Sequence, residues 1–504
     1  MSIDLQTPCP APFNLAAYVL AAGARAPEKT ALEVLGDNPQ IWSYARLTRA
    51  VRGVASGLLD AGLTSGDIVL LRLGNTADFP IAYLGAIAAG MIAVPTSSAL
   101  TKPEITKMAQ GIRPAAVLQD SGLAAPDLDD ARTIPLETLR RFYDLPPAPW
   151  HLGDPERPAY IVFTSGTSGT PRGVIHAHRA IWARRMMHEG WYDLHENDRL
   201  LHAGAFNWTF TLGTGLMDPW TIGATALIPE DGTAPEALPE LLVAHRASLF
   251  AAAPGVFRKL LRCDLPELPA LRHALSAGEK MPAALHEDWQ QSTGLRAYEA
   301  FGMSECSTFI SSSPTSPVDR SALGRAQAGR KTALLDEYGA PVAQGKIGTI
   351  AVHKSDAGLM LGYFGAPEET KARFQGDWFV TGDLGRQDET GAIHFEGRGD
   401  DMMNAGGFRL SPIEVESVFQ GVHGIEHCAA IEVTLKQGVQ VIALCYSAQS
   451  DVQESTLQAL ATQRLARYKQ PRIYHHSDTL PTSANGKLLR RVLRSQIEAQ
   501  YGQA

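Results

Sequence analysis

The chain has 504 residues, of which 45% are hydrophobic and 19% charged, a composition typical of a globular protein with room for roughly three to four units of about 150 residues. Its net charge of −8, with no run of lysine or arginine, argues against a nucleic-acid partner. The five cysteines are scattered and form no CxxC pair, which argues against a disulfide framework or a zinc site and favours a reducing cytoplasm.

The first part of the chain predicts alternating helices and buried strands. Asp4 stands where a secretory signal would carry positive charge, so no signal peptide is predicted. The run "YARLTRAVRGVASGLLDAGL" (44–63) has apolar residues at helical spacing, whereas "DIVLLRLGN" (67–75) is typical of a short buried strand. Two glycines and a proline interrupt the uncharged run "FPIAYLGAIAAGMIAVPTSSAL" (79–100), which predicts a buried helix followed by a strand rather than a membrane span.

A hydroxyl-rich segment follows in "YIVFTSGTSGTPRGVIHAH" (160–178), where a strand-like run leads directly into serine, threonine and glycine. Backbone N–H groups and hydroxyls in such a loop can all point at one anion, and glycine allows a close approach. The pattern favours a chain of phosphates, although the GxxxxGK[ST] pattern of P-loop NTPases is absent. The alternative is a surface linker with few side chains.

Further helix–strand alternation appears in "TAPEALPELLVAHRASLFAAAPGVFRKLL" (233–261), and such alternation predicts parallel sheets covered by helices on both faces. From about residue 324 the pattern changes to short strands joined by Gly/Asp turns, which predicts hairpins or a small distorted barrel.

The tail predicts a small domain of its own. "SPIEVESVFQ" (411–420) should open a helix, with Ser411 as cap, Pro412 in the first turn and Glu414 three residues after the cap. Two strand patterns and one helical pattern follow it. The fold prediction is therefore α/β: a large N-terminal domain (1–399) of helix-covered, mostly parallel sheets, its last part (324–399) barrel-like, and a small α+β C-terminal domain (400–504).

Several motifs occur in one order along the chain, and together they resemble the adenylate-forming superfamily of acyl-CoA synthetases, adenylation domains and firefly luciferase. Besides the hydroxyl-rich loop, they are "YEAFGMSEC" (298–306), "WFVTGDLG" (378–385), "GRGDDMMNAGGFRLSPIEVE" (397–416), "LARYKQPR" (465–472) and "LPTSANGKLLRRVLR" (480–494). The resemblance spans nearly the whole chain. Within the superfamily, "SAGEKMPAALHEDW" and "FGMSECSTFISSSP" are most similar to benzoate-type and related aryl- or acyl-CoA ligases.

The resemblance implies an enzyme with a hinge at Asp400 and a mobile C-terminal domain. It implies two steps that use ATP, Mg²⁺ and coenzyme A: a carboxylic acid forms an acyl-adenylate and pyrophosphate, and the thiol of coenzyme A then displaces AMP. Lys487 would bridge the carboxylate and the α-phosphate, and Glu305 with Thr164 would hold Mg²⁺. The triphosphate cradle would comprise Thr164, Ser165, Gly166, Thr167, Ser168 and Gly169.

Other nucleotide contacts follow from the same resemblance. Phe301 would lie against adenine, Asp383 would hold the ribose hydroxyls, and Arg398 would act at the ribose or the phosphates. Arg172 and Asn404 stand where many relatives carry lysine. The full set placed around the cofactors also includes Gly278, Glu299, Ala300, Gly302, Ser304, Gly407 and Arg409.

The acid pocket is expected to contain three aromatic side chains that alternate as in a strand or lie on one side of a loop, with core packing as the alternative for each. The predicted pocket residues are Phe206, Trp208, Phe210, Gly278, Gly302 and Met303. Glycine at position 302, where acetate-specific relatives have tryptophan, favours an aromatic or medium-length acid. The sequence shows no obvious second cation for a dicarboxylate and leaves only Lys280, His202 and His245 as candidates.

Two other functions remain open at this stage. A stand-alone carrier protein could replace coenzyme A as the thiol, or the chain could bind a nucleotide or acyl-adenylate without catalysis. The predicted partners are therefore a small carboxylic acid, ATP and coenzyme A, without nucleic acid or a membrane span, and a homodimer is allowed.

Overall fold

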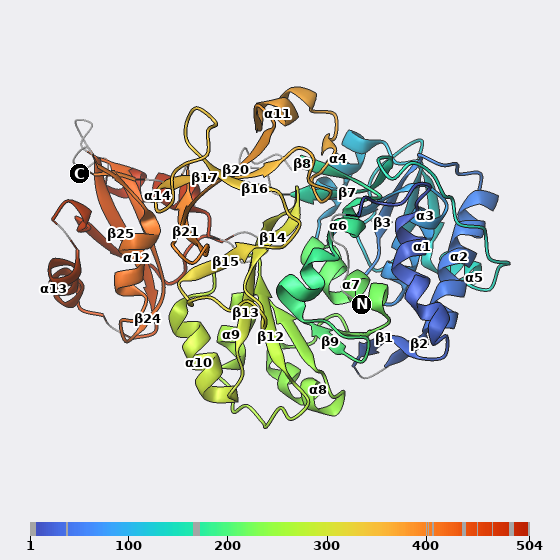
Figure 1. Cartoon of the computed structure of the whole chain (residues 1–504), viewed down its shortest axis with the longest axis horizontal. Helices are drawn as coiled ribbons and strands as arrows, with labels where there is room; N and C mark the ends of the chain where they lie inside the picture. Colours follow the sequence, from blue (N-terminus) through green and yellow to red (C-terminus); the bar gives the residue numbers. More distant parts are fainter. Residues whose placement is uncertain are drawn as a thin grey trace. The chain divides into compact units, whose positions relative to one another are not determined.

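Helices and strands alternate along most of the chain in this computed structural model (Figure 1). The structure describes residues 7–36, 39–164, 172–399, 401, 403–405, 408–435, 440–450, 452–465, 467–482 and 488–501. The chain divides into unit 1 (Met1–Thr332 and Val352–Asp377) and unit 2 (Ala333–Ala351 and Trp378–Ala504).

The larger sheet of unit 1 has a parallel centre and antiparallel edges. Its strands lie in the order β15 (Ala322–Ala326), β14 (Ser307–Ser311), β13 (Ala297–Met303), β12 (His273–Ala277), β11 (Leu249–Ala252), β9 (Arg199–His202), β10 (Thr225–Pro229), β1 (Thr30–Leu35) and β2 (Gln40–Ser43). Neighbours from β13 to β1 are parallel. Every residue of β12 is buried, as expected for a parallel strand covered on both faces.

Helices cover one face of this sheet with large apolar side chains. Leu242 of α8 (Leu238–Ala244), Phe257 of α9 (Pro254–Leu260) and Trp289 of α10 (Ala283–Thr293) share one core cluster with Leu201 and Phe250 of the sheet. Figure 1 shows these helices beside β12 and β13. The opposite face packs against the segment that contains the π-helices η2 (His188–Tyr192) and η3 (Thr211–Met217).

A second sheet in unit 1 contains the strands on both sides of the hydroxyl-rich loop. Its order is β18 (Gly362–Tyr363), β8 (Arg172–Ala177), β7 (Pro158–Thr164), β4 (Ile92–Pro95), β3 (Ile68–Arg72), β5 (Ala116–Gln119) and β6 (Arg132–Pro135). In this sheet, neighbouring strands from β6 to β7 are parallel. Strand β8 is antiparallel to β7, and β18 is antiparallel to β8. The mostly parallel sheets that the sequence predicts are confirmed.

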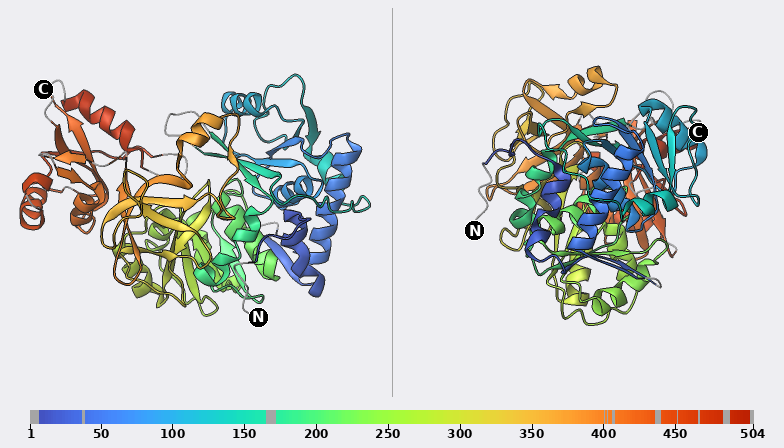
Figure 2. Two further views of the ribbon diagram at one scale, coloured as in Figure 1. Left: turned by 45° about the horizontal axis from the view of Figure 1, so that its top comes forward. Right: turned by 90° about the vertical axis from the view of Figure 1, so that its right-hand side faces the viewer.

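The apolar run 79–100 forms a buried helix followed by a strand, as predicted. Every residue of α3 (Asp78–Ala88) is buried, and β4 follows it directly. Helices α1 (Leu15–Leu20) and α2 (Tyr44–Asp60) pack against α3, and both views in Figure 2 show these blue helices beside the strands. Within the described ranges, no helix has both the length and the apolar character needed to cross a membrane.

Unit 2 contains a hairpin region and the tail domain. Strands β16 (Thr332–Leu335), β17 (Ile347–His353), β20 (Trp378–Gln387) and β21 (Ile393–Arg398) are neighbours in this order. In the tail, β24 (Ile425–Thr434), β25 (Gln440–Ala448) and β26 (Ile473–His476) form a sheet. Alternate residues of β24 and β25 pack on α12 (Pro412–Phe419) and α13 (Glu454–Arg464), and the others on α14 (Arg490–Tyr501).

The predicted helix cap of α12 is confirmed. The Ser411 side chain accepts a hydrogen bond from the Ile413 N–H, and Pro412 occupies the first turn. A Cβ atom on Gly397, at the end of β21, would lie 3.5 Å from the Ser411 hydroxyl. Gly397 thus lies close to the start of α12, and residues 378–399 belong with the tail to unit 2. The predicted domain boundary at residue 400 stays a prediction. The hinge at Asp400 lies outside the described residues and stays a prediction.

Unit 1 contains buried histidines that are neutral at physiological pH. Burial is the main cause that lowers their pKa values, to about 4 for His176, 3 for His178, 4 for His188, 3 for His202 and 4 for His273. The Nδ1 atom of His178 accepts the Leu15 N–H at 3.0 Å, which requires the neutral ring. The unfolded chain binds protons below about pH 6.5, whereas these folded side chains do not.

We therefore expect the free energy of unfolding to fall as the pH drops from about 6.5 towards 4, by up to about 1.4 kcal/mol per pH unit for each histidine. Urea titrations followed by tryptophan fluorescence at pH 7.5, 6 and 5 measure this, since of the eight tryptophans all but Trp378 lie in unit 1. His178→Asn should weaken the pH dependence of the free energy of unfolding by the contribution of one histidine. An unchanged dependence in this variant would contradict the assignment of His178.

Candidate functional site

The strands that flank the hydroxyl-rich loop form an antiparallel hairpin. Thr164 at the end of β7 lies opposite Arg172 at the start of β8. The two ends of the loop therefore leave the sheet side by side, as a loop that surrounds an anion requires. The loop itself (165–171) lies outside the described residues, so the predicted roles of Ser165, Gly166, Thr167, Ser168 and Gly169 stay predictions.

Arg172 has partners within unit 1. Its Nε lies 2.7 Å from Oε2 of Glu369 in α11 (Pro367–Ala372), and its guanidinium carbon lies 5.5 Å from the centre of the Tyr363 ring. The Arg172 side chain is 28% exposed, so the pair is partly screened by water. A phosphate at this position would compete with Glu369 for the guanidinium group, and the place of Arg172 among the residues around the cofactors stays a prediction.

The turn that carries Glu305 is tied to β18 and β8. The Tyr363 hydroxyl donates to Oε1 of Glu305 at 2.7 Å, and the Met360 N–H donates to the Glu305 carbonyl at 2.8 Å. The Ser304 carbonyl accepts from Nε2 of His176 at 2.6 Å. Burial and the Glu305 carboxylate raise the pKa of Tyr363, which keeps its hydroxyl protonated as a donor. Glu305 is thus held in place beside the strand that begins at Arg172.

Glu305 fits a magnesium ion that is bound mainly by the nucleotide. Across the described residues, no group of three or more His, Cys, Asp or Glu side chains is arranged to hold a metal. Mg²⁺ usually binds through one or two carboxylates together with substrate phosphates and water, rather than in an all-protein cage. The Glu305 carboxylate therefore suits Mg²⁺, and the hydroxyl of Thr164 at the end of β7 is the second predicted ligand.

In β13, which precedes Glu305, the side chains of Phe301 and Glu299 contact other residues of unit 1. The Phe301 ring packs edge-on against Phe309 at 5.5 Å between centroids. Glu299 is 3% exposed, and its carboxylate accepts from Nζ of Lys280 at 2.6 Å and from the Met281 N–H at 3.1 Å. Nucleotide contacts by Phe301, Glu299 and the neighbouring Ala300 stay predictions.

Gly302 has a packing role in the β13–β14 hairpin. A Cβ atom at this position would lie 2.2 Å from the Ser307 carbonyl oxygen and 2.5 Å from Cα of Thr308, so glycine is required for the strands to approach. The predicted free depth behind Gly302 therefore receives no support from the structure, because the space is filled by the backbone of β14. The pocket roles of Gly302 and Met303 stay predictions.

Two of the three predicted pocket aromatics lie together. The rings of Trp208 and Phe210 meet edge-on at 5.1 Å, and a Cβ on Gly278, whose φ is +101°, would lie 2.8 Å from the Trp208 ring. Phe206 is 1% exposed and packs on Phe79 at 5.6 Å, away from this pair. The segment forms a turn that enters a helix, so of the two expected arrangements the strand is wrong.

The three candidates for a second cation have other roles. The Lys280 ammonium is held by Glu299 and by the Arg320 and Ala322 carbonyls. His202 is fully buried with its pKa lowered to about 3, and His245 lies 3.1 Å from Oε2 of Glu33. A dicarboxylate would therefore need a cation other than these.

Unit 2 brings together two residues predicted to contact the nucleotide. Asp383 of β20 lies opposite Arg398 of β21 in the hairpin, with Nη1 of Arg398 3.5 Å from Oδ1 of Asp383. The Asp383 N–H donates to Oγ1 of Thr381 at 3.0 Å, which fixes the backbone at this position. Their predicted roles at the ribose and phosphates stay predictions.

Some predicted residues lie outside the described structure. Lys487, Asp400 and Gly407 are not described. Arg409 and Asn404 pair across the short hairpin of β22 (Met403–Ala405) and β23 (Phe408–Leu410), and their side chains are not described. The roles assigned to Lys487, Asp400, Gly407 and Arg409 stay predictions, and Asn404 has no assigned role.

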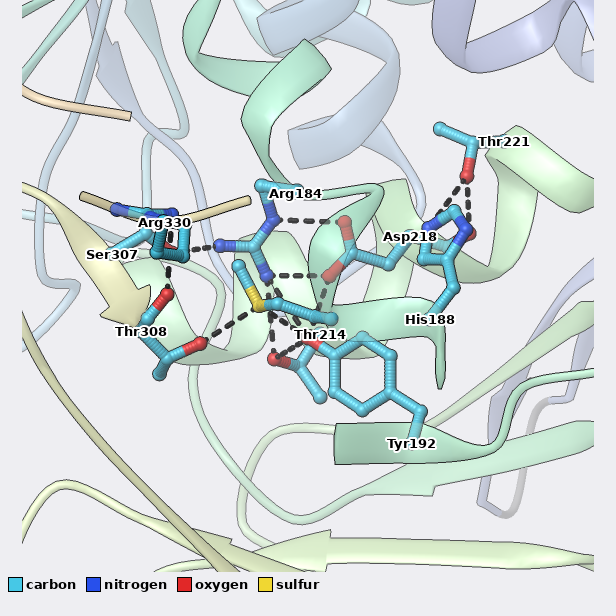
Figure 3. Close-up of polar contacts among 10 residues, drawn as sticks. Arg184, His188, Tyr192, Thr214, Asp218, Thr221, Ser307, Thr308 and Arg330 are labelled. Carbon is cyan, nitrogen blue, oxygen red and sulfur yellow. Dashed lines mark hydrogen bonds and ion pairs between the residues drawn. The ribbon is translucent and has the colours of Figure 1, made fainter. Parts of the chain in front are cut away.

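Sequence reasoning missed a buried polar network next to the Glu305 turn (Figure 3). Arg184 donates to both carboxylate oxygens of Asp218, at 2.8 and 2.5 Å, and also contacts the Ser307 hydroxyl. Tyr192 donates to Asp218 at 2.7 Å. A signal was available, because Arg184 and Asp218 are charged residues within the apolar runs "AIWARRMM" and "TGLMDPWTI" and therefore suggest a buried pair.

Comparison with protein families gives two matches. A family model described as AMP-binding enzyme matches residues 20–364, and one described as AMP-binding enzyme C-terminal domain matches residues 414–487.

Individual relatives are similar over most of their length. A benzoate–CoA ligase of Thauera aromatica is 27% identical, with 91% of this chain and 92% of the relative covered. The mitochondrial acyl-coenzyme A synthetase ACSM2A of Homo sapiens is 27% identical, with 98% and 92% covered. Among solved structures, ATP-bound MatB from Rhodopseudomonas palustris has a TM-score of 0.87 at 25% identity and covers 97% of this chain and 99% of its own. A benzoate CoA ligase from Burkholderia xenovorans LB400 has a TM-score of 0.85 at 26% identity, with 96% and 100% covered.

Proposed function

Because this chain belongs to the AMP-binding enzyme family, we propose that it is an ATP-dependent acid–CoA ligase that releases AMP and pyrophosphate. The observation that carries the proposal is the anchored carboxylate of Glu305. It lies on a turn bonded to β8 and β18, and β8 begins where the hydroxyl-rich loop ends. The predicted magnesium residue and the strand that follows the predicted phosphate loop thus belong to one connected part of unit 1.

In the first proposed step, an oxygen of the substrate carboxylate bonds to the α-phosphorus of ATP, and the bond from that phosphorus to the bridging oxygen breaks to release pyrophosphate. The acid is ionised at neutral pH, so the step requires no general base. It requires neutralisation of negative charge, because an anion approaches a polyanion. Mg²⁺, when bound, supplies part of that charge, with Glu305 and Thr164 as its protein ligands, and Lys487 supplies another part.

In the second proposed step, the sulfur of coenzyme A bonds to the acyl carbon and AMP leaves with the electron pair of the broken C–O bond. The thiol proton is lost as the thioester forms. We propose that the segment around Asp400 turns between the steps, and that Gly407 and Arg409 then contact coenzyme A.

We propose an aromatic or short- to medium-chain acid as the substrate. Trp208 and Phe210 offer two adjoining aromatic rings, and Gly278 in its left-handed conformation allows Trp208 to lie against the backbone. The relatives that are named for benzoate support the aromatic alternative.

The substrate and thiol can be identified in one assay. AMP release is measured with benzoate, cinnamate, hexanoate and acetate, each with free coenzyme A or with a phosphopantetheinylated carrier protein. We expect benzoate or a related acid to exceed acetate, and free coenzyme A to be converted to the thioester. Thioester on the carrier protein alone would show that the enzyme loads a carrier instead.

A further inference from the structure

The three residues that directly follow Glu305 are held by two buried arginines. Arg330 donates from Nη2 to the Cys306 carbonyl at 3.0 Å and from Nη1 to the Thr308 carbonyl at 3.3 Å. Arg184 donates to the hydroxyl of Ser307, the residue between them. Figure 3 shows both arginines at this short segment, which forms the end of the Glu305 turn and the start of β14.

Each arginine is neutralised by its own aspartate. The side chains of Arg330 and Asp356 are 0% and 1% exposed and lie 3.1 Å apart, and those of Arg184 and Asp218 are 8% and 0% exposed. Asp356 is fixed further by the Lys331 N–H at 3.0 Å and the Gly358 N–H at 2.8 Å. Since each pair has no net charge, neither adds a cation for the phosphates, and their effect on the site must come through geometry.

The backbone at Ser307 needs such support. Its φ of +61° lies in the left-handed region, where glycine or asparagine is the usual residue. The turn is closed by the Cys306 N–H donating to the Met303 carbonyl at 3.1 Å. The hydrogen bond from Arg184 ties the side chain of this unfavourable residue to a rigid ion pair, and thereby fixes the direction in which β14 leaves the turn.

We propose that Arg184–Asp218 and Arg330–Asp356 are positioning pairs that fix the Ser304–Cys306 turn, so that the Glu305 carboxylate keeps the orientation required for Mg²⁺–ATP. This inference rests on the proposed function, in which Glu305 contacts Mg²⁺. The link is short, because Glu305 is two residues from Ser307 and its carboxylate accepts a 2.7 Å hydrogen bond from Tyr363 in this position of the turn.

Ser307→Ala tests the inference, because it removes the hydroxyl and leaves both ion pairs in place. Calorimetry measures binding of AMP-CPP, the ATP analogue with a methylene group between the α- and β-phosphates, with and without Mg²⁺. We expect the increase in affinity caused by Mg²⁺ to be about tenfold smaller in the variant than in wild type. The affinity without Mg²⁺ should stay within about twofold of the wild-type value. Ser311→Ala is the matched control, since Ser311 is a buried serine in the same strand that bonds the Gly190 carbonyl at 2.6 Å. It should behave as wild type.

A second variant separates positioning from folding. Arg184→Met combined with Asp218→Leu replaces one buried pair by apolar side chains, an exchange that often preserves stability. We expect this double variant to show the same loss of the Mg²⁺ effect as Ser307→Ala. The single variant Arg184→Lys should keep part of the Mg²⁺ effect. A Mg²⁺ effect equal to wild type in Ser307→Ala, or a parallel loss of metal-free binding, would overturn the positioning role. Wild-type protein that binds no Mg²⁺–AMP-CPP would instead contradict the proposed function itself.

Discussion

Replacing Lys487 by alanine is expected to slow acyl-adenylate formation about 1,000-fold, the upper range for loss of one group that stabilises transition-state charge. Thioester formation from supplied acyl-adenylate should stay within about threefold of wild type, because the α-phosphate is then already joined to the acyl group as a mixed anhydride and no polyanion is attacked. Pyrophosphate exchange measures the first half-reaction, and coenzyme A consumption with supplied adenylate measures the second.

Lys354→Ala is the control for this variant, since Lys354 is exposed and pairs with Asp377 at 2.7 Å in unit 1. It should leave both half-reactions unchanged. Matched losses of both half-reactions in Lys487→Ala would mean that the lysine supports the fold or the small domain as a whole rather than the chemistry of the first step.

Glu305→Gln is expected to lower kcat/KM for Mg²⁺–ATP about 100-fold, equivalent to about 2.7 kcal/mol, and to shift the Mg²⁺ dependence to higher concentration. Glutamine keeps the shape and can still accept the hydrogen bond from Tyr363, so the change removes mainly the negative charge. Initial rates of AMP release over a Mg²⁺ series measure both effects.

Glu33→Gln provides a matched loss of charge in unit 1, because Glu33 lies in β1 and is paired with Arg199 at 2.9 Å. Its Mg²⁺ dependence should equal that of wild type. If Glu305→Gln also kept the wild-type Mg²⁺ dependence, Glu305 would be a structural partner of Tyr363 rather than a metal ligand.

Local patterns predicted much of the fold. The helical spacing of 44–63 and the Ser411 cap lead to α2 and α12, because both features depend on residues within a few positions of one another. The run of uncharged residues at 79–100 similarly fixes a buried helix and strand, since no amphipathic face exists to meet water.

Contacts across long separations could not be predicted in the same way. Tyr363 reaches Glu305 because β18 pairs with β8, and nothing in the local pattern of "MLGYFG" indicates that pairing. The role of Gly302 also depends on a neighbouring strand: an empty side-chain position is equally compatible with a substrate pocket and with a close backbone approach, and the structure shows the latter.

The candidate site also contains residues that local motifs indicate and residues that only long-range contacts bring together. Glu305, Thr164, Asp383 and Arg398 are identified by short motifs, whereas the pairs that hold the Glu305 turn join residues between 26 and 34 positions apart. Buried pairs of this kind are set by packing, and the sequence indicates them only as charges within apolar runs.

The identity of the nucleotide product distinguishes an AMP-forming ligase from other ATP-cleaving enzymes. Purified protein is incubated with Mg²⁺–ATP, coenzyme A and each acid of the panel, and AMP, ADP and pyrophosphate are separated and quantified. We expect AMP and pyrophosphate in equal amounts, with one thioester formed per AMP, for at least one acid. ADP as the product, or no cleavage of ATP with any acid, would contradict it.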